Sequence, residues 1–340
     1  MQYGTGFKLH ENLYWMRKLL LFFIIYDGII VILYWYFPTE WLTLPWQPIS
    51  LIGIMTAFFL GFKNNSSFER SMEARKIWGG IVNTSRSMAV QIRDFVTNEF
   101  TATPLSDEEL KKVHKKMVLR HVAWLKALTY ELRVFRPWEN NSADDKKVRI
   151  EFGTLHNEEK YDELKDYLSV EDYDYIIQKG NKPSHLLSLQ SKQFKELRHA
   201  GHIDDFRHME IQSLITELYA LQGKSERIKN YPIPTGYTSV CNYFTWTFTL
   251  LVPFGMLHAF EELSKTSYLW LAIPFSLLVS WVFHLARMVG AGYEHPFQGL
   301  AGDVPIDSMA RGIEIDIRQM LDDSDIPKPL EPVGPWKILY

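Results

Sequence analysis

The chain has 340 residues, with 37 Lys and Arg against 40 Asp and Glu, so its formal net charge is −3. This near balance argues against a protein that binds nucleic acid through a general positive charge. The single cysteine, Cys241, excludes an intrachain disulfide framework and a zinc site built from several cysteines. Apolar residues make up 46% of the chain, and a mean hydropathy of −0.15 is typical of soluble proteins.

The distribution of the charges changes that interpretation. Four stretches contain no charged residue except Asp27: residues 19–37, 49–62, 240–260 and 269–286. Three of them approach or exceed the roughly 20 apolar residues of a spanning helix, and interfacial residues can extend the shorter second one. All four are apolar on every side and are flanked by Trp and Tyr, as at a bilayer interface. These features favour an all-α membrane protein with four transmembrane helices over a soluble protein with four buried core helices.

The Lys and Arg residues indicate the orientation of these four helices. They precede the first stretch and follow the second and the fourth, whereas the links 38–47 and 261–268 carry only Lys265. The positive-inside rule then places both termini and the large helical middle region in the cytosol of a cell-membrane protein, in the inner membrane if the source is bacterial. We therefore predict four segments: 1–62 with helices one and two, 63–235 as a cytosolic helical region, 236–290 with helices three and four, and 291–340 as a cytosolic helix and tail.

The first helices of the cytosolic region are marked by capping residues. Ser106 and Glu109 have the spacing of a capping box, which predicts a helix from there to about Arg133. Ser184 is predicted to cap another helix, which ends near His199.

The later helices are predicted from apolar spacing and helix breakers. Residues 203–221 repeat apolar side chains at helical spacing, and Gly223 is the predicted stop. A further helix is predicted over residues 305–321 because it starts with proline. The tail after it is predicted to be extended and to need a neighbouring surface for order.

Few polar residues suggest chemistry. Three histidines close in sequence could bind a metal, but their spacing does not put them on one face, and a solvated polar turn is the favoured interpretation: His199, His202 and His208. No metal and no cofactor is therefore expected. Asp27 is the one intramembrane charge, and either a pore or packing role with a polar partner on another helix or a local structural role beside Gly28 remains open.

The second apolar stretch carries a sharper pattern. Ile54, Phe58 and Phe62 recur every four residues and form one stripe of a helix face. Small residues form an adjacent stripe that would allow close helix packing: Gly53, Ala57 and Gly61. The bulky stripe could line a narrow apolar constriction in a symmetric oligomer, or it could face lipid or the bundle core, and spacing alone favours the second alternative.

The segments around these helices resemble the bestrophin family, in its bacterial branch. The resemblance is carried by Leu60-Gly61-Phe62 and by the run that starts at Phe68 and ends in Glu73-Ala74-Arg75-Lys76-Ile77-Trp78-Gly79. It extends over residues 8–325, with similar motifs at these positions: Gly223-Lys224-Ser225-Glu226-Arg227-Ile228, Pro232-Ile233-Pro234, Tyr237, His295-Pro296-Phe297, Asp303, Pro305 and Ile313-Glu314.

The resemblance implies a homopentameric channel for small monovalent ions, in a lipid bilayer and without nucleic acid as a partner. The family's pore neck corresponds to Ile54, Phe58 and Phe62, and its cytosolic constriction corresponds best to Met209, with Phe206 as a rival. Calcium-gated animal members have an acidic run after their Asn-Pro-Phe element, whereas residues 298–303 hold one carboxylate, so the resemblance does not imply a calcium clasp here.

Alternatives remain open both for the ion that is conducted and for the functional class of the protein. The resemblance favours an anion (chloride) channel, because the neck resembles the anion-conducting form and aromatic ring edges are partially positive. A monovalent cation (sodium) channel of the same fold is the alternative. A membrane-bound adaptor or enzyme with a cytosolic binding region is the alternative of another class, although no converging polar pocket appears in the sequence.

Overall fold

The computed structural model describes residues 9–37, 40–139, 158–264, 268–334 and 337–340. Within these ranges the chain is helical, and the one β-type pairing is an isolated antiparallel bridge between Val333 and Ile338. The structure divides into two compact units that are described separately. Of the described residues, one unit contains those within 9–70 and 232–294, and we call it the apolar unit. The other contains those within 71–231 and 295–340, and we call it the charged unit.

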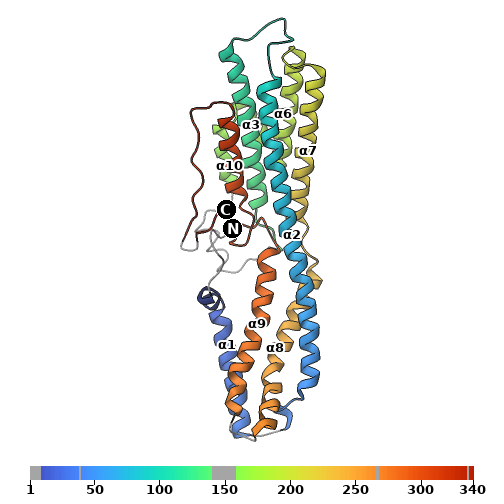
Figure 1. Ribbon diagram of the computed structural model, residues 1–340, viewed down its shortest axis with the longest axis vertical. Helices are drawn as coiled ribbons and strands as arrows, with labels where there is room; N and C mark the ends of the chain where they lie inside the picture. The colour runs from blue at the N-terminus through green and yellow to red at the C-terminus, as the bar shows by residue number, and fades with distance from the viewer. Residues whose placement is uncertain (1–8, 38–39, 140–157, 265–267, 335–336) are drawn as a thin grey trace. The chain divides into compact units, whose positions relative to one another are not determined.

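Four helices build the apolar unit: α1 (Leu9–Tyr36), the first part of α2 (Trp46–Phe95), α8 (Thr235–Ser264) and α9 (Ala272–Tyr293). Two short 3₁₀ turns accompany them, at Glu40–Leu42 and Leu269–Leu271. Helix α9 packs against both α1 and α8, as Figure 1 shows. Helix α8 continues through Pro253 without a break.

Three stretches of this unit are long and apolar enough to cross a membrane: Leu9–Tyr36, Thr235–Glu261 and Leu269–Tyr293. They contain three of the four predicted spans. The remaining stretch, 49–62, forms the beginning of the 50-residue helix α2, in which charged residues follow directly. Since this apolar part is shorter than a full span, the fourth transmembrane helix stays a prediction.

The charged unit is a helical bundle. It consists of the second part of α2, α3 (Asp107–Arg133), a 3₁₀ segment η2 (Glu158–Asp166), α5 (Val170–Ile177), α6 (Lys182–His199), α7 (Asp205–Asn230) and α10 (Ile306–Gln319). Its core contains Trp78 and Met88 from α2, Trp124 from α3 and Phe194 from α6, all at most 1% exposed. The extended tail after α10 ends with Ile338 and Tyr340 buried.

Helix α3 begins as predicted, whereas two later predictions were wrong. Ser106 and Glu109 form a complete capping box, and α3 ends at Arg133. Helix α6 begins three residues earlier than predicted, because Asn181 is its cap and accepts a hydrogen bond from the Ser184 backbone N–H.

Helix α7 does not stop at Gly223 but continues to Asn230. Packing outweighs the low helix propensity of glycine here, since Ser225 and Ile228 beyond it are buried in the bundle. Helix α10 starts one residue after Pro305, close to the predicted start.

Candidate functional site

The apolar stripe, Ile54, Phe58 and Phe62, lies on the outside of the described chain. Its side chains are 65%, 59% and 54% exposed, although each is large and apolar. The rings of Phe58 and Phe62 meet edge to face, with centroids 4.5 Å apart and planes at 87°. The three residues therefore form one continuous apolar ridge that no other described part of the chain covers.

The opposite face of α2 packs against α8. A Cβ atom at Gly53 would lie 2.6 Å from the Phe248 ring, so the absent side chain permits this contact. The Thr56 hydroxyl donates to its own helix at Ile52 O and lies 3.4 Å from Phe244 O. In the predicted small-residue stripe only Gly53 packs in this way, because Ala57 and Gly61 are exposed.

One residue after the stripe, Lys63 forms a buried ion pair. Its Nζ lies 3.1 Å from Glu294 Oε2 at the end of α9, and the two side chains are 2% and 9% exposed. Thr238 of α8 donates a hydrogen bond of 3.2 Å to the other carboxylate oxygen. The pair joins α2, α8 and α9 and fixes the face that α2 turns outward. Sequence reasoning used Lys63 only for topology, and no motif indicated its partner.

Two further contacts join this part of α2 to α9 and to α8. Asn64 donates to Ala286 O at 3.0 Å, and a Cβ atom at Gly290 would collide with the Asn64 side chain. The Tyr237 hydroxyl donates to Phe59 O at 3.1 Å. Cys241 is fully buried, with its Sγ 3.7 Å from the same carbonyl oxygen.

The two candidates for a cytosolic constriction lie on α7. Phe206 and Met209 are three residues apart and are 86% and 69% exposed, so they share the outer face of its first turns. Asp204 caps this helix by accepting hydrogen bonds from the backbone N–H groups of Phe206 and Arg207.

The neighbouring histidines have separate surroundings. His202 is buried with its Nδ1 3.2 Å from Thr97 O, and within the described ranges no group of three His, Cys, Asp or Glu residues is arranged to hold a metal ion. His202 therefore contributes to the packing of the bundle.

The segment after His295-Pro296-Phe297 does not fit a calcium ion. Asp303 accepts hydrogen bonds from the backbone N–H groups of Gly299 and Leu300 at 2.6 and 3.0 Å, and its Oδ2 lies 4.0 Å from Arg133 Nη1. Burial raises the pKa of this carboxyl to about 6, against the opposing effect of Arg133. The positive charge beside Asp303 is thus the Arg133 guanidinium. In addition, one enclosed carboxylate cannot give the six to eight oxygen ligands that calcium takes.

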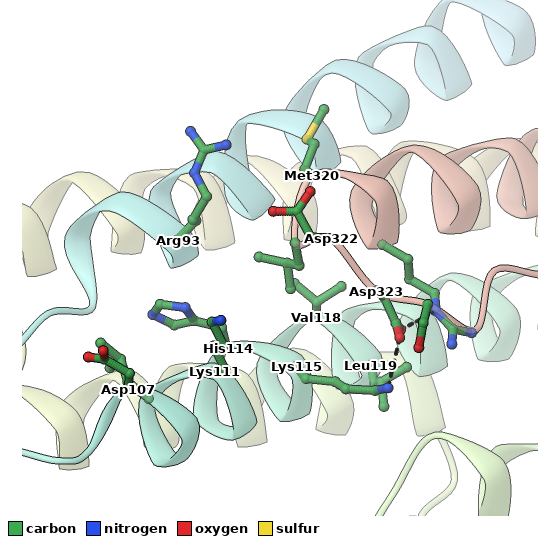
Figure 2. Close-up of a pocket in the computed structure, with 14 residues that line it drawn as sticks. Arg93, Asp107, Lys111, His114, Lys115, Val118, Leu119, Met320, Asp322 and Asp323 are labelled. Atoms are coloured by element: carbon green, nitrogen blue, oxygen red, sulfur yellow. Dashed lines mark hydrogen bonds and ion pairs between the residues drawn. The ribbon is translucent and has the colours of Figure 1, made fainter.

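A pocket of about 510 Å³ lies in the charged unit (Figure 2). Arg93 of α2, His114 and Lys115 of α3 and Asp322 after α10 line it. His114 already contacts Val96 O through Nε2 at 2.8 Å, and Lys115 is paired with Asp323 at 2.9 Å. Its polar groups are thus largely engaged in holding the helices together.

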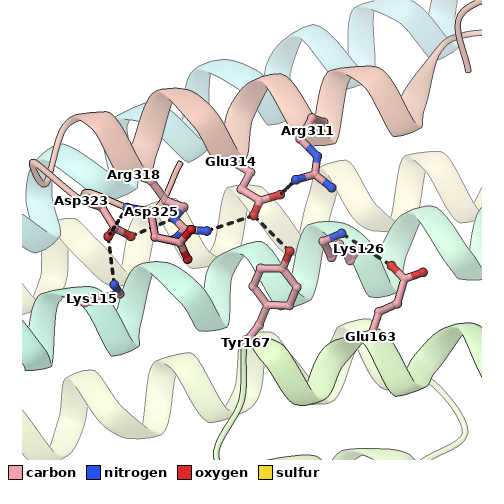
Figure 3. Close-up of polar contacts among 9 residues, drawn as sticks. All are labelled: Lys115, Lys126, Glu163, Tyr167, Arg311, Glu314, Arg318, Asp323 and Asp325. Atoms are coloured by element: carbon pink, nitrogen blue, oxygen red, sulfur yellow. Dashed lines mark hydrogen bonds and ion pairs between the residues drawn. The ribbon is translucent and has the colours of Figure 1, made fainter. Parts of the chain in front are cut away.

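Helix α10 is held on the bundle by charge pairs along its length (Figure 3). Glu314 accepts a hydrogen bond from the Tyr167 hydroxyl at 3.1 Å and lies 3.3 and 3.4 Å from Arg311 and Arg318. Asp323 bridges Arg318 and Lys115. Each carboxylate shown here has a cationic or hydroxyl partner, so the network supports a structural function.

An all-helical chain with membrane-length helices and a charged helical unit is a multi-span membrane protein. The profile of the bacterial and fungal bestrophin proteins matches residues 13–319, and the chain therefore belongs to the bestrophin family. The fold agrees: the structure of a bacterial bestrophin homologue from Klebsiella pneumoniae superposes with a TM-score of 0.74 at 24% identity, covering 90% of this chain and 98% of that one.

Curated relatives carry channel names. The chain is 25% identical over 316 residues to the voltage-dependent anion channel-forming protein YneE of Escherichia coli K12, covering 93% of this chain and 89% of that protein. It is 25% identical over 279 residues to a Ralstonia nicotianae protein of the same description, covering 82% and 78%. A chloroplast voltage-dependent chloride channel of Arabidopsis thaliana is 21% identical over 267 residues, with 78% and 55% covered. The family is thus one of channels rather than of enzymes.

Proposed function

We propose that the chain forms a pentameric channel that conducts small monovalent anions, with chloride as the main candidate, through one central pore. The observation that carries this proposal is the exposed apolar ridge of Ile54, Phe58 and Phe62 on α2. Large exposed apolar patches mark interaction surfaces or functional grooves. The channel names of the relatives support the same function.

In this proposal, five copies of the ridge surround the pore and form its neck. Apolar side chains give a passing ion no ligand to replace its water, so a narrow ring of them raises the barrier and can gate by dewetting. Aromatic rings carry partial positive charge at their edges, and two of the three neck residues are aromatic. This ring-edge charge favours anions over cations, and a sodium-conducting channel of the same fold is the alternative.

The same proposal assigns a second constriction to α7. Met209 is our first candidate and Phe206 the second, because both project from the outer face of the helix. We further propose four transmembrane helices in the cell membrane, with both termini and the charged unit on the cytosolic side.

Recording from purified protein in planar bilayers tests the channel. Discrete single-channel currents are expected, and reversal potentials in a potassium chloride gradient should follow the chloride equilibrium potential. A reversal potential near the potassium equilibrium value would instead establish the cation alternative. Flux that saturates without discrete openings would contradict a channel. Native mass spectrometry should give five chains of 39.9 kDa each.

The neck assignment has its own test. Phe58→Ala removes an aromatic ring from the ridge and should widen the neck, so single-channel conductance should rise several-fold. Ile25→Ala on α1 is a matched control, since Ile25 is also apolar and 53% exposed but lies outside the ridge. Equal conductance of the Phe58→Ala variant and the native chain would contradict the neck assignment.

A further inference from the structure

Asp27 is an unpaired carboxylate inside the apolar unit. It lies in the middle of α1 and is 0% exposed. Neither Oδ1 nor Oδ2 has a hydrogen-bond partner among the residues that the structure describes. A charged group enclosed in this way is costly unless a positive charge compensates it.

Two buried serines lie on the face of α9 that packs against α1, and the register of the two helices brings one of them, Ser280, to the level of Asp27. The helices run antiparallel (Figure 1), and the Phe23 ring lies 5.3 Å from the His284 ring. At the other end, Tyr34 of α1 and Ala272 of α9 belong to one apolar cluster. Asp27 follows Phe23 by one turn of α1, and Ser280 precedes His284 by one turn of α9. The same register brings Ser276 to the next turn.

Both serines are as enclosed as Asp27. Ser276 and Ser280 are 0% exposed, and within the described ranges neither hydroxyl has a hydrogen-bond partner. Buried hydroxyls elsewhere in this unit behave differently, since Thr245 and Thr249 each donate to the carbonyl four residues earlier at 2.8 Å. The four-residue spacing of Ser276, Ser280 and His284 keeps all three on the face of α9 that meets α1.

We propose that Asp27, Ser276 and Ser280 form a binding site for one monovalent inorganic cation of the sodium type. The set consists of oxygen atoms alone, which are the ligands that hard cations prefer. Its single negative charge is neutralised by one positive charge, whereas a divalent ion would leave an excess charge in a low-dielectric region. A proton would neutralise Asp27 as well, because the neutral carboxyl group can donate to one hydroxyl and accept from another, and the experiment below distinguishes the two occupants.

This site is separate from the ridge on α2, and it goes beyond the proposed channel function without resting on it. The cation would bridge α1 and α9, so the expected effect of binding is stabilisation of the apolar unit. His284 and Thr249 lie beside the site, with His284 Nε2 3.4 Å from Thr249 Oγ1, and they provide the neighbouring polar groups.

Thermal unfolding of the purified full-length chain in detergent tests the proposal. We expect the melting temperature to rise by several degrees, with saturation, when sodium chloride replaces choline chloride at constant ionic strength. Asp27→Asn should abolish this rise, because the carboxylate charge is removed. Ser280→Ala should shift the half-saturating sodium concentration at least tenfold upward. Ser239→Ala, which removes an exposed hydroxyl bonded to its own helix, is the matched control and should behave as the native chain does.

Two results would overturn the site. One is a native melting temperature that is the same in sodium and choline between pH 5 and pH 8. The other is a stability that depends on pH but not on sodium and loses that pH dependence in Asp27→Asn, which would identify a proton as the occupant. If Asp27→Asn does not fold, Ser280→Ala and Ser276→Ala test the site, and an unchanged half-saturating sodium concentration in both variants would contradict it. Phe58→Ala should keep the sodium effect, which separates this site from the pore.

Discussion

At the scale of single residues, the charged unit encloses a histidine that must remain neutral. His121 of α3 is 2% exposed, and neither ring nitrogen has a hydrogen-bond partner in the described part of the chain. Its ring lies 5.1 Å from the Trp124 ring. Burial lowers the pKa of His121 to about 3, because protonation would put an unpaired charge in the core.

We therefore expect His121 to make the fold sensitive to acid. Between pH 3 and pH 6.5 the unfolded chain binds the proton more strongly, so the free energy of unfolding falls as the pH falls through this range. From pH 7 to pH 5 the loss from this residue should be about 2 kcal/mol. His121→Phe should reduce the loss by this amount, measured as melting temperature against pH. An unchanged pH profile would show that His121 is hydrated or paired in solution.

The ion pair of Lys63 and Glu294 leads to a second prediction at this scale. Glu294→Gln leaves the Lys63 ammonium buried without its counterion and should cost about 3 kcal/mol of stability. In the double variant with Lys63→Met the two costs should not add, because the uncompensated charge disappears. A double-mutant cycle on melting temperatures checks this. Additive effects would mean that the two groups do not interact.

At the scale of elements, two glycines of α2 have opposite surroundings. Gly53 meets the Phe248 ring, whereas a Cβ atom at Gly61 would meet nothing within 4 Å. Gly53→Ala should therefore destabilise the chain by about 1–3 kcal/mol through overpacking. Gly61→Ala should be neutral or stabilising by up to about 1 kcal/mol, because alanine favours the helix.

Melting temperatures of the two glycine variants test this contrast. If Gly61→Ala were as damaging as Gly53→Ala, the open space at Gly61 would have to be filled by another copy of the chain. That outcome would contradict the prediction for the single chain and would locate a subunit contact beside Phe58 and Phe62.

The elements also show what sequence patterns can predict. The capping box of Ser106 and Glu109 is local, and it predicted the start of α3 correctly. Gly223 was misjudged because its effect depends on distant packing, which carries α7 on to Asn230. The four-residue spacing of Ile54, Phe58 and Phe62 predicts one shared helix face, and the three side chains are all exposed, but their place in a pore neck stays a prediction. The partner of Lys63 is Glu294 at the end of α9, more than 200 residues away in sequence, and no local pattern contains it.

At the scale of the whole molecule, the end of the described chain returns to the charged unit. The Ser308 backbone N–H near the start of α10 donates to Tyr340 O at 2.5 Å, and Ile338 is 2% exposed. Removing residues 331–340 deletes this cap and uncovers the surface beneath Ile338. A buried side chain of this size contributes about 1.5–3 kcal/mol, so the melting temperature should fall by several degrees.

A point substitution in the same segment provides the control. Lys337 has a φ of 46°, a conformation that glycine adopts without strain, so Lys337→Gly should keep the native melting temperature or raise it slightly. If the truncated chain melted at the native temperature as well, the tail would not be part of the cooperative fold.

The burial of Cys241 makes the native chain suitable for thiol labelling. The only sulfhydryl in the sequence is 0% exposed, so water-soluble maleimides should leave the protein essentially unmodified. A cysteine introduced at Ile54, Phe58 or Phe62 would then be the only thiol in the chain that reacts with the maleimide. Its accessibility to charged reagents added from either side of a bilayer would report directly whether water reaches that position.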